Sequence, residues 1–338
     1  MKNSFLFGLM IAALVASLLI SLALGRYEID LSTLTQLLLW KVLNIGTAPK
    51  EVMLLSNIVF DIRLPRILAV VLVGAALSVS GGAFQAMFVN PLVSPGILGV
   101  LAGASFGAAL GIMISDSWFG VQLFSFAFGF VAVLVALGVA KIYGRSGSQT
   151  ILLVLGGVIS SSLFSALLSM VKYVADPYNK LPTIVYWLMG SFSAVDMKTL
   201  SGVAIPLILS TIVLSFMGKY LNVLSLGDED AKALGVRVVW VRNSAILLAT
   251  LLSTLTVVVA GMIGWVGLII PHIARFLVGA DNRVLLPMCA LLGATFLIIV
   301  DTLCRTSMSV EIPIGIATSL IGIPIFVFAL KNAKKGFA

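Results

Sequence analysis

Long stretches without any charged side chain are the feature that most constrains this sequence. An α-helix needs about 20 mostly apolar residues to cross the hydrocarbon core of a bilayer. Of the 338 residues, 60% are hydrophobic and only 10% are charged, which excludes a soluble globular protein, a disordered chain and a disulfide scaffold. We therefore expect an all-α integral membrane protein in which residues 1–338 form one transmembrane domain. Eight stretches lack Asp, Glu, Lys and Arg: residues 3–25, 67–115, 117–140, 146–171, 199–218, 243–274, 284–300 and 312–330.

Two of these stretches are long enough to contain two helices each. Residues 67–115 are interrupted by an Asn-Pro to Pro-Gly segment at 90–96, and residues 243–274 carry Gly261 and Gly264, so they could form one long helix or two short ones. Dividing both predicts ten transmembrane helices, with the two termini on the same side. Cytoplasmic loops are enriched in Lys and Arg, and both ends of the chain carry lysines. We expect both termini to be cytoplasmic.

The predicted topology indicates where the formal net charge of +8 lies. The ten-helix arrangement places the whole surplus of basic residues on the cytoplasmic side and leaves the other side balanced. The sequence has no basic cluster interleaved with stacking aromatic residues, which a nucleic-acid surface would need. We therefore expect no nucleic-acid partner, and a basic face toward anionic lipid.

Ionisable residues are almost absent from the predicted spans. Asp301 and His272 are the candidates, and both fall near predicted helix ends. An ion-coupled secondary transporter usually keeps such groups near the midplane, so this class is disfavoured. Cys289 and Cys304 lie too far apart on one predicted helix for a disulfide. We expect no catalytic residue, no metal site and no cofactor in this chain, and the sequence has no phosphate-binding loop of the Walker type.

Small residues recur at every fourth position in two spans. Gly99, Gly103, Gly107 and Gly111 would form one bare stripe on a helix, which favours close helix packing. The fifth span carries a second, mildly polar stripe, which is either a packing face or one wall of a water-filled path. Spacing alone leaves both alternatives open. The residues of this second stripe are Gly157, Ser161, Ser165 and Ser169.

Two predicted loops stand out. Residues 61–66 place Arg63 and Arg66 on the predicted outside, against the positive-inside tendency. They are either interfacial anchors or a docking site for an acidic partner. Residues 224–236 combine three acidic residues with a following glycine, which indicates a short helix in the inside loop. That helix is either a solvated loop element or a contact for a soluble partner.

These motifs, in this order, resemble the permease subunit of ATP-binding-cassette (ABC) importers for vitamin B12, haem and iron–siderophore chelates. Each motif is weak alone, and their order and spacing make the resemblance specific along most of the chain. The matching segments are residues 63–66, 74–77, 80–81, 90–92, 98–99, 103–104, 187–191, 227–236, 264–268, 271–272, 311–315 and 320–324, together with Gln85, Pro95, Arg275, Asp301 and Arg305.

The resemblance implies a vitamin-B12-importer-type permease fold with ten transmembrane helices per subunit, in the bacterial inner membrane. It implies a homodimer, two cytoplasmic ATPase subunits that hold ATP and Mg²⁺, and an extracytoplasmic substrate-binding protein. It also implies residue roles. Arg63, Arg66 and Arg305 would dock the binding protein, and Gly157, Ser161, Ser165 and Ser169 would line the path. The coupling loop would be about residues 219–242, and its ATPase contacts would be Gly227, Asp228, Glu229, Ala231, Leu234 and Gly235.

The sequence indicates the class of transporter more strongly than the cargo that it carries. A mildly polar, uncharged path favours a small oxyanion of the molybdate or tungstate type, as in one branch of the family. An iron–siderophore, haem or vitamin B12 importer is the alternative, and an ion-coupled secondary transporter is the alternative from a different class. In every importer version the chain itself is a transport subunit and not an enzyme.

Overall fold

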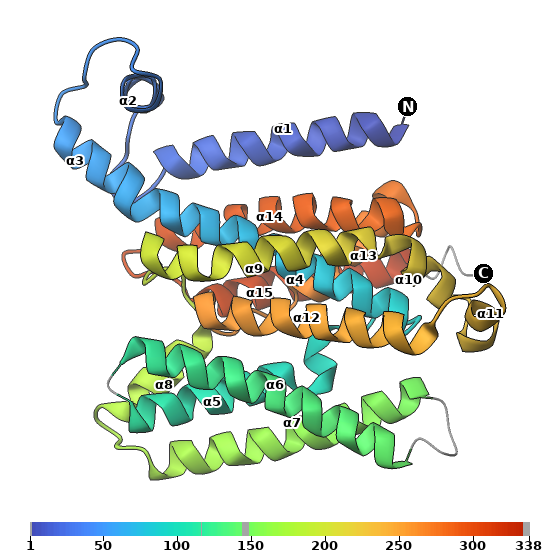
Figure 1. Cartoon of the computed structure of the whole chain (residues 1–338). Coiled ribbons are helices and arrows are strands. Elements are labelled where there is room, and N and C mark those ends of the chain that lie inside the picture. Colours follow the sequence, from blue (N-terminus) through green and yellow to red (C-terminus); the bar gives the residue numbers. More distant parts are fainter. Residues whose placement is uncertain (1, 116, 144–148, 334–338) are drawn as a thin grey trace.

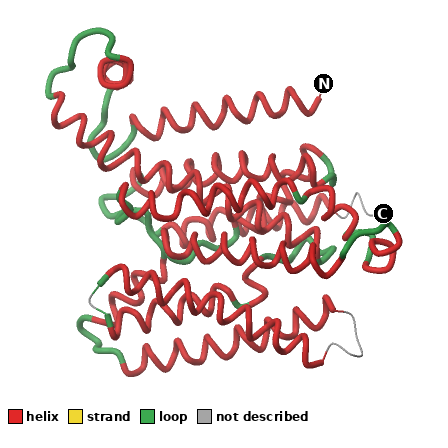
Figure 2. The backbone as a smooth tube through the Cα atoms, viewed as in Figure 1, coloured by secondary structure: helices red, strands yellow, loops and turns green. Residues whose placement is uncertain are grey.

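The computed structural model describes all residues except 1, 116, 144–148 and 334–338, and in this part of the chain every regular element is helical. Most of the long helices run side by side along one direction, and loops join them at the two ends (Figures 1 and 2). The helices are α1 (Lys2–Ala23), α2 (Leu31–Leu43), α3 (Val52–Ser56), η1 (Asn57–Arg63), α4 (Leu64–Met87), η2 (Pro95–Leu98), α5 (Val100–Ile114), α6 (Trp118–Tyr143), α7 (Gln149–Val174), α8 (Lys180–Met189), α9 (Met197–Phe216), α10 (Gly218–Leu224), α11 (Asp228–Ala233), α12 (Val238–Ala260), α13 (Val266–Val278), α14 (Asn282–Thr306) and α15 (Ile314–Ala333).

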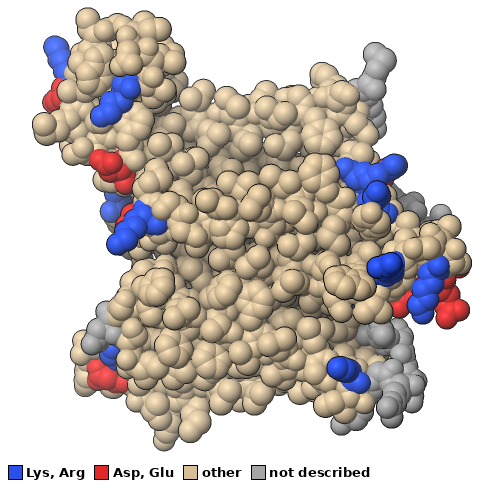
Figure 3. Space-filling model, viewed as in Figure 1, with Lys and Arg blue, Asp and Glu red and all other residues tan. Residues whose placement is uncertain are grey.

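The bundle has the charge distribution of a membrane protein. Seven of the described helices are long and apolar enough to cross a bilayer, and α5, α13 and the described part of α15 are shorter apolar helices. Charged side chains gather at the two ends of the molecule, and an uncharged belt separates them (Figure 3). This confirms an all-α, multi-pass membrane protein, whereas the count of ten spans stays a prediction.

Both long charge-free stretches are divided in two. The first breaks after α4, where η2 leads through Gly99, at a φ of 84°, into α5. The second breaks between α12 and α13, where Gly261 has a φ of 68° and Trp265 a φ of 70°. Positive φ is incompatible with a continuing right-handed helix. The structure therefore selects two helices for residues 243–274.

Glycine lets the central helices approach one another closely. A Cβ atom on Gly81 of α4 would overlap the carbonyl oxygen of Gly267 in α13. In the stripe predicted for close packing, Gly103 and Gly107 lie against the backbone of α6. Gly99 departs from that prediction, because it precedes α5 rather than belonging to the helix. Small residues thus replace side-chain interdigitation by backbone contact at these crossings.

The two ends of the bundle differ. α1 begins at the end where α11 lies, whereas α2, α3 and α8 lie at the opposite end (Figure 1). We call these the α11 end and the α2 end. Cys289 and Cys304 are both buried and free, as their spacing predicts.

Candidate functional site

The predicted loop helix exists and is α11. Gly227 precedes it with a φ of 108°, and Asp228, Glu229 and Asp230 occupy its first turn, where carboxylates interact favourably with the helix dipole. The helix ends in a Schellman motif, in which the N–H of Gly235 bonds to the carbonyl of Lys232 and the N–H of Val236 to that of Ala231. Gly235 has a φ of 77°, so the predicted terminal glycine is required by the backbone.

One side of α11 is anchored and the other is open. Ala231 is fully buried, and Arg242 of α12 donates to Asp228 with an Nη1–Oδ2 distance of 3.1 Å. Glu229, Leu234 and Gly235 are exposed at the α11 end. The candidate coupling residues therefore divide into an anchoring pair, Asp228 and Ala231, and a surface that a soluble partner can contact.

A second polar cluster at the α11 end joins α10 to α14. Asn222 donates to the carboxylate of Asp281 at 2.6 Å and accepts from the backbone N–H of Asn282. Arg283 lies beside the same carboxylate, with an Nη2–Oδ2 distance of 2.7 Å. The Arg283 hydrogen bond, followed by that of Asn222, holds the pKa of Asp281 well below its ordinary value of 3.8. This cluster caps α14 and positions the segment that leads into α11.

The predicted path residues all lie on α7, but they have different surroundings. Gly157 is buried against the backbone of Ile97 in η2, and the neighbouring Ser160 donates to the carbonyl of Ala132 in α6 at 2.7 Å. Ser161 is half-buried, whereas Ser165 and Ser169 are exposed on the surface of the chain. One stretch of α7 thus packs against the rest of the subunit. Toward the α2 end Ser165 and Ser169 are exposed, and the Ser169 hydroxyl donates to the Ser165 carbonyl at 2.9 Å.

Arg63 is buried beneath the end of α1. Its guanidinium donates to the carbonyls of Leu22, Ala23 and Tyr27, and the side chain is 5% exposed. The last carbonyls of an α-helix have no partner within the helix. Arg63 supplies that partner for α1.

Arg66 and Arg305 belong to a neighbouring ionic cluster that links α4 and α14. Arg66 contacts Asp301 at 2.8 Å and Glu311 at 2.9 Å. Arg305 lies 3.6 Å from Asp301 and also donates to Ser21 Oγ in α1 at 2.7 Å. The structure brings the three predicted docking arginines to the same end of the bundle, and in this conformation their guanidinium groups bind the chain itself. The docking role stays a prediction.

Sequence reasoning missed two features near these residues. It assigned no partner to Glu311, which is separated from Arg66 by 245 residues of chain. It also missed a cavity of about 170 Å³ beside the break between α12 and α13, whose lining includes Ser80, Ser94 and Ser253. The glycines at 261–267 were the signal for this break, but nothing in a single sequence shows which serines face it.

Comparison with known proteins identifies the family. Residues 13–332 match the FecCD transport family. The chain is 42% identical over 332 residues to the molybdate import system permease protein MolB of Haemophilus influenzae, covering 98% of this chain and 96% of that protein. It is 39% identical over 281 residues to the vitamin B12 import system permease protein BtuC of Salmonella paratyphi A, covering 82% of this chain and 84% of that protein.

A solved structure agrees with these relatives. An ABC transporter of the metal-chelate type, in an inward-facing conformation, superimposes with a TM-score of 0.85 at 39% identity, and the match covers 97% of this chain and 99% of that one. Fold, length and sequence therefore agree along nearly the whole molecule. The chain belongs to the FecCD transport family and is a permease subunit of an ABC importer.

Proposed function

We propose that this permease carries a small oxyanion of the molybdate or tungstate type. The stripe of uncharged hydroxyls on α7, open at Ser165 and Ser169, is the observation that carries the proposal. Hydroxyl groups donate hydrogen bonds to oxyanions without the strong binding that a buried cation would add, so a delivered anion can leave. The similarity to a molybdate permease over nearly the full length of both chains supports this choice.

The working importer has two copies of this chain around a central path lined by α7. The α11 end is cytoplasmic and contacts two ATPase subunits through Glu229, Leu234 and Gly235. The α2 end receives an extracytoplasmic binding protein. Ten spans and cytoplasmic termini follow if α5, α13 and α15 cross the membrane together with the seven longer helices.

The contacts of α11 suggest how nucleotide-driven motion reaches the path. Arg242 ties Asp228 to α12, and α12 runs without interruption to the break at Gly261. A displacement of α11 therefore moves the helix that borders the serine-lined cavity. ATP and the binding protein shift the equilibrium between inward-open and outward-open states only through their different affinities for the two states.

Uptake into proteoliposomes tests the proposal. Vesicles containing the permease and its ATPase, supplied with binding protein, should accumulate labelled molybdate only when ATP is present on the side of the membrane where the ATPase lies. A protonophore should leave this uptake unchanged. Uptake of a ferric siderophore without molybdate uptake would contradict the oxyanion proposal. That outcome would favour the metal-chelate alternative, which the similar solved structure supports.

A further inference from the structure

Helix α2 lies outside the bundle of spanning helices. It runs crosswise to α1, so that Figure 1 views it end-on beside the far end of α1. Asp30 caps its N-terminus by accepting from the backbone N–H of Ser32, and Asn44 in the left-handed conformation ends it. Contacts with the chain or with its surroundings must hold this 13-residue helix at one edge of the molecule.

One face of α2 is covered by the chain. Leu34 and Leu37 are buried in a cluster with Leu22 at the end of α1 and Leu55 and Val59 on the α3–η1 segment. Lys41 donates to Ser56 Oγ at 3.0 Å on the same side. These contacts fix the rotation of α2 about its own axis.

The adjoining face is apolar and uncovered by the described residues. Leu31, Val42 and Ile45 are each nearly 60% exposed, and Leu39 is 38% exposed. Together with Ser32, Thr35, Gln36 and Gly46, three of them line a groove of about 500 Å³. The polar groups in it are satisfied locally, since Thr35 donates to the Leu31 carbonyl at 2.7 Å and Gln36 to the Thr47 carbonyl at 3.1 Å.

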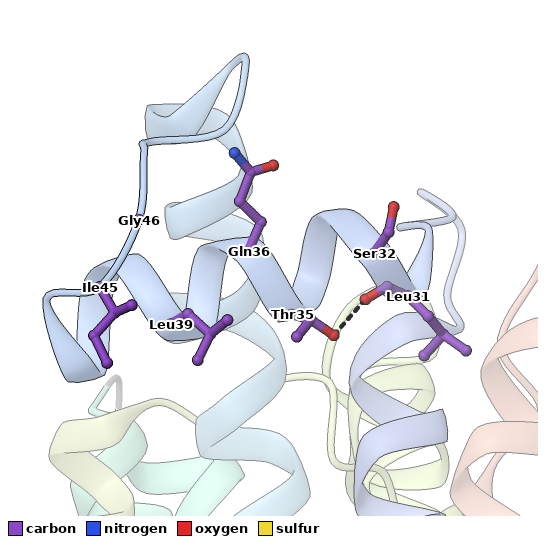
Figure 4. A pocket seen from close by; sticks show the side chains of 7 residues that line it. All are labelled: Leu31, Ser32, Thr35, Gln36, Leu39, Ile45 and Gly46. Carbon is purple, nitrogen blue, oxygen red and sulfur yellow. Dashed lines mark hydrogen bonds between the residues drawn. The ribbon is translucent and has the colours of Figure 1, made fainter.

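The exposed residues of α2 point in different directions. Figure 4 shows Leu31 and Ile45 pointing toward the side where the ribbons of the bundle lie, whereas Ser32 and Gln36 point away from it. Leu39 follows Gln36 by three residues and lies on a neighbouring part of the helix surface. α1 has 22 residues, about 33 Å of helix, so a bilayer about 30 Å thick that it spans ends where α2 begins. The side of α2 that carries Leu31 and Val42 is thus placed at the level where the hydrocarbon would end.

The surface that continues from this side is apolar and exposed along α1, as expected of a surface in contact with lipid. Only 11% of the apolar window of α1 is buried, and Leu9, Val15 and Leu19 are exposed along it. Tyr27, 43% exposed, and the half-buried Trp40 lie at the level of α2, and amphipathic aromatic residues concentrate at the membrane interface.

We propose that α2 lies in the plane of the membrane surface, with the side that carries Leu31 and Val42 covered by the lipid leaflet at the α2 end. Bilayer lipid, rather than a protein partner, covers this apolar side. The helix thereby holds the α2 end of α1 at a fixed depth. This inference depends on the membrane setting and not on the cargo.

Spin-label accessibility tests the proposal with a matched pair of variants. Val42→Cys and Gln36→Cys are labelled in the full chain reconstituted in phosphatidylethanolamine–phosphatidylglycerol vesicles, without nucleotide, cargo or partner. The label at 42 should collide with oxygen several-fold more than with a water-soluble nickel complex, and the label at 36 should show the reverse. Leu31→Cys repeats the apolar position. The unsubstituted chain, whose two cysteines are buried, gives the background.

Two results would overturn the proposal. Equal access of the nickel complex to positions 31, 36 and 42 would place both sides of the helix in water. Labels at 31 and 42 that neither reagent reaches would mean that protein covers the apolar side. Because no transport is measured, either failure is independent of the test of molybdate uptake.

Discussion

The guanidinium group of Arg66 can bind carboxylates of its own chain or a carboxylate of a binding protein, and these two uses compete. Within the chain it contacts Asp301 and Glu311, and its side chain is 11% exposed. A carboxylate on a binding protein would have to displace one of these internal partners. Sequence order could not show this competition, because the two acidic residues lie 235 and 245 residues further along the chain.

Replacing Arg66 should therefore affect the fold before it affects docking. Arg66→Ala leaves Asp301, 2% exposed, with the more distant Arg305 as its remaining cationic partner, and loss of one member of a buried pair costs about 3 kcal/mol. We expect the melting temperature of the purified permease to fall by several degrees. Adding Asp301→Asn should recover part of the loss. An unchanged melting temperature, with weakened binding-protein association, would show that the docking role dominates.

Gly81 offers a test of backbone packing with a matched control. A methyl group at Gly81 would overlap the carbonyl oxygen of Gly267, so Gly81→Ala must push α4 and α13 apart. We expect a loss of about 1–3 kcal/mol or more and a lower yield of folded protein in size-exclusion chromatography. Gly8→Ala, on α1 with open space around it, should be neutral or slightly stabilising. Equal behaviour of the two variants would contradict the packing argument.

Among the elements, α11 combines an anchored side with an open side, so a substitution on the open side separates coupling from folding. Glu229 is exposed and the structure gives it no part in the anchor to α12. Glu229→Lys should lower ATP-driven uptake several-fold by weakening the ATPase contact, while the melting temperature stays within about 1 °C of wild type. Lys50→Glu, exposed at the opposite end, is the charge-reversal control for ATPase association, measured with the purified permease and ATPase without binding protein. Unchanged uptake by Glu229→Lys would remove this residue from the coupling surface.

The N-terminus of α14 carries a pH-dependent contribution to stability. The pKa of Asp281 is lowered in the folded state, mainly by Arg283. Its stabilising effect is therefore full above the unfolded pKa and is lost progressively as the pH falls from about 4 toward the lowered pKa of the folded state. Asp281→Asn keeps a capping side chain but removes the charge. We expect its melting temperature to lie about 1–3 °C below wild type at neutral pH, with the gap narrowing as the pH falls below about 4. A gap that stays constant with pH would exclude the carboxylate charge as its origin.

Some elements were easier to predict than others for physical reasons. Charge-free runs mark buried or lipid-facing helices, so the spanning helices and the turn at 90–96 were predicted from sequence. The break at Gly261 stayed open, because glycine permits a positive φ without requiring it. α2 was missed, since Lys41 interrupts its apolar run, and the contacts of its ammonium group with Ser56 and Phe60 form only on folding.

At the scale of the whole molecule, the chain is one subunit of an importer, and the described residues leave part of α7 uncovered. α7 has its hydroxyl side open at Ser165 and Ser169 while Ser160 of the same helix is sealed against α6. Gly157 also belongs to the sealed part, which the four-residue spacing alone could not distinguish. Whether the open side faces a second copy across a watery path or faces lipid decides how the transporter is built.

Thiol chemistry distinguishes these arrangements. We expect Ser169→Cys, in proteoliposomes with the ATPase and binding protein, to react with a charged, membrane-impermeant methanethiosulfonate and to lose uptake several-fold, because the side chain lines a watery path. Ser160→Cys, buried against the Ala132 carbonyl, should not react, and the unsubstituted chain supplies the background because its cysteines are buried. If Ser169→Cys instead reacts only with a lipid-soluble maleimide and retains uptake, then α7 faces lipid there. The path would then have to be sought on another helix.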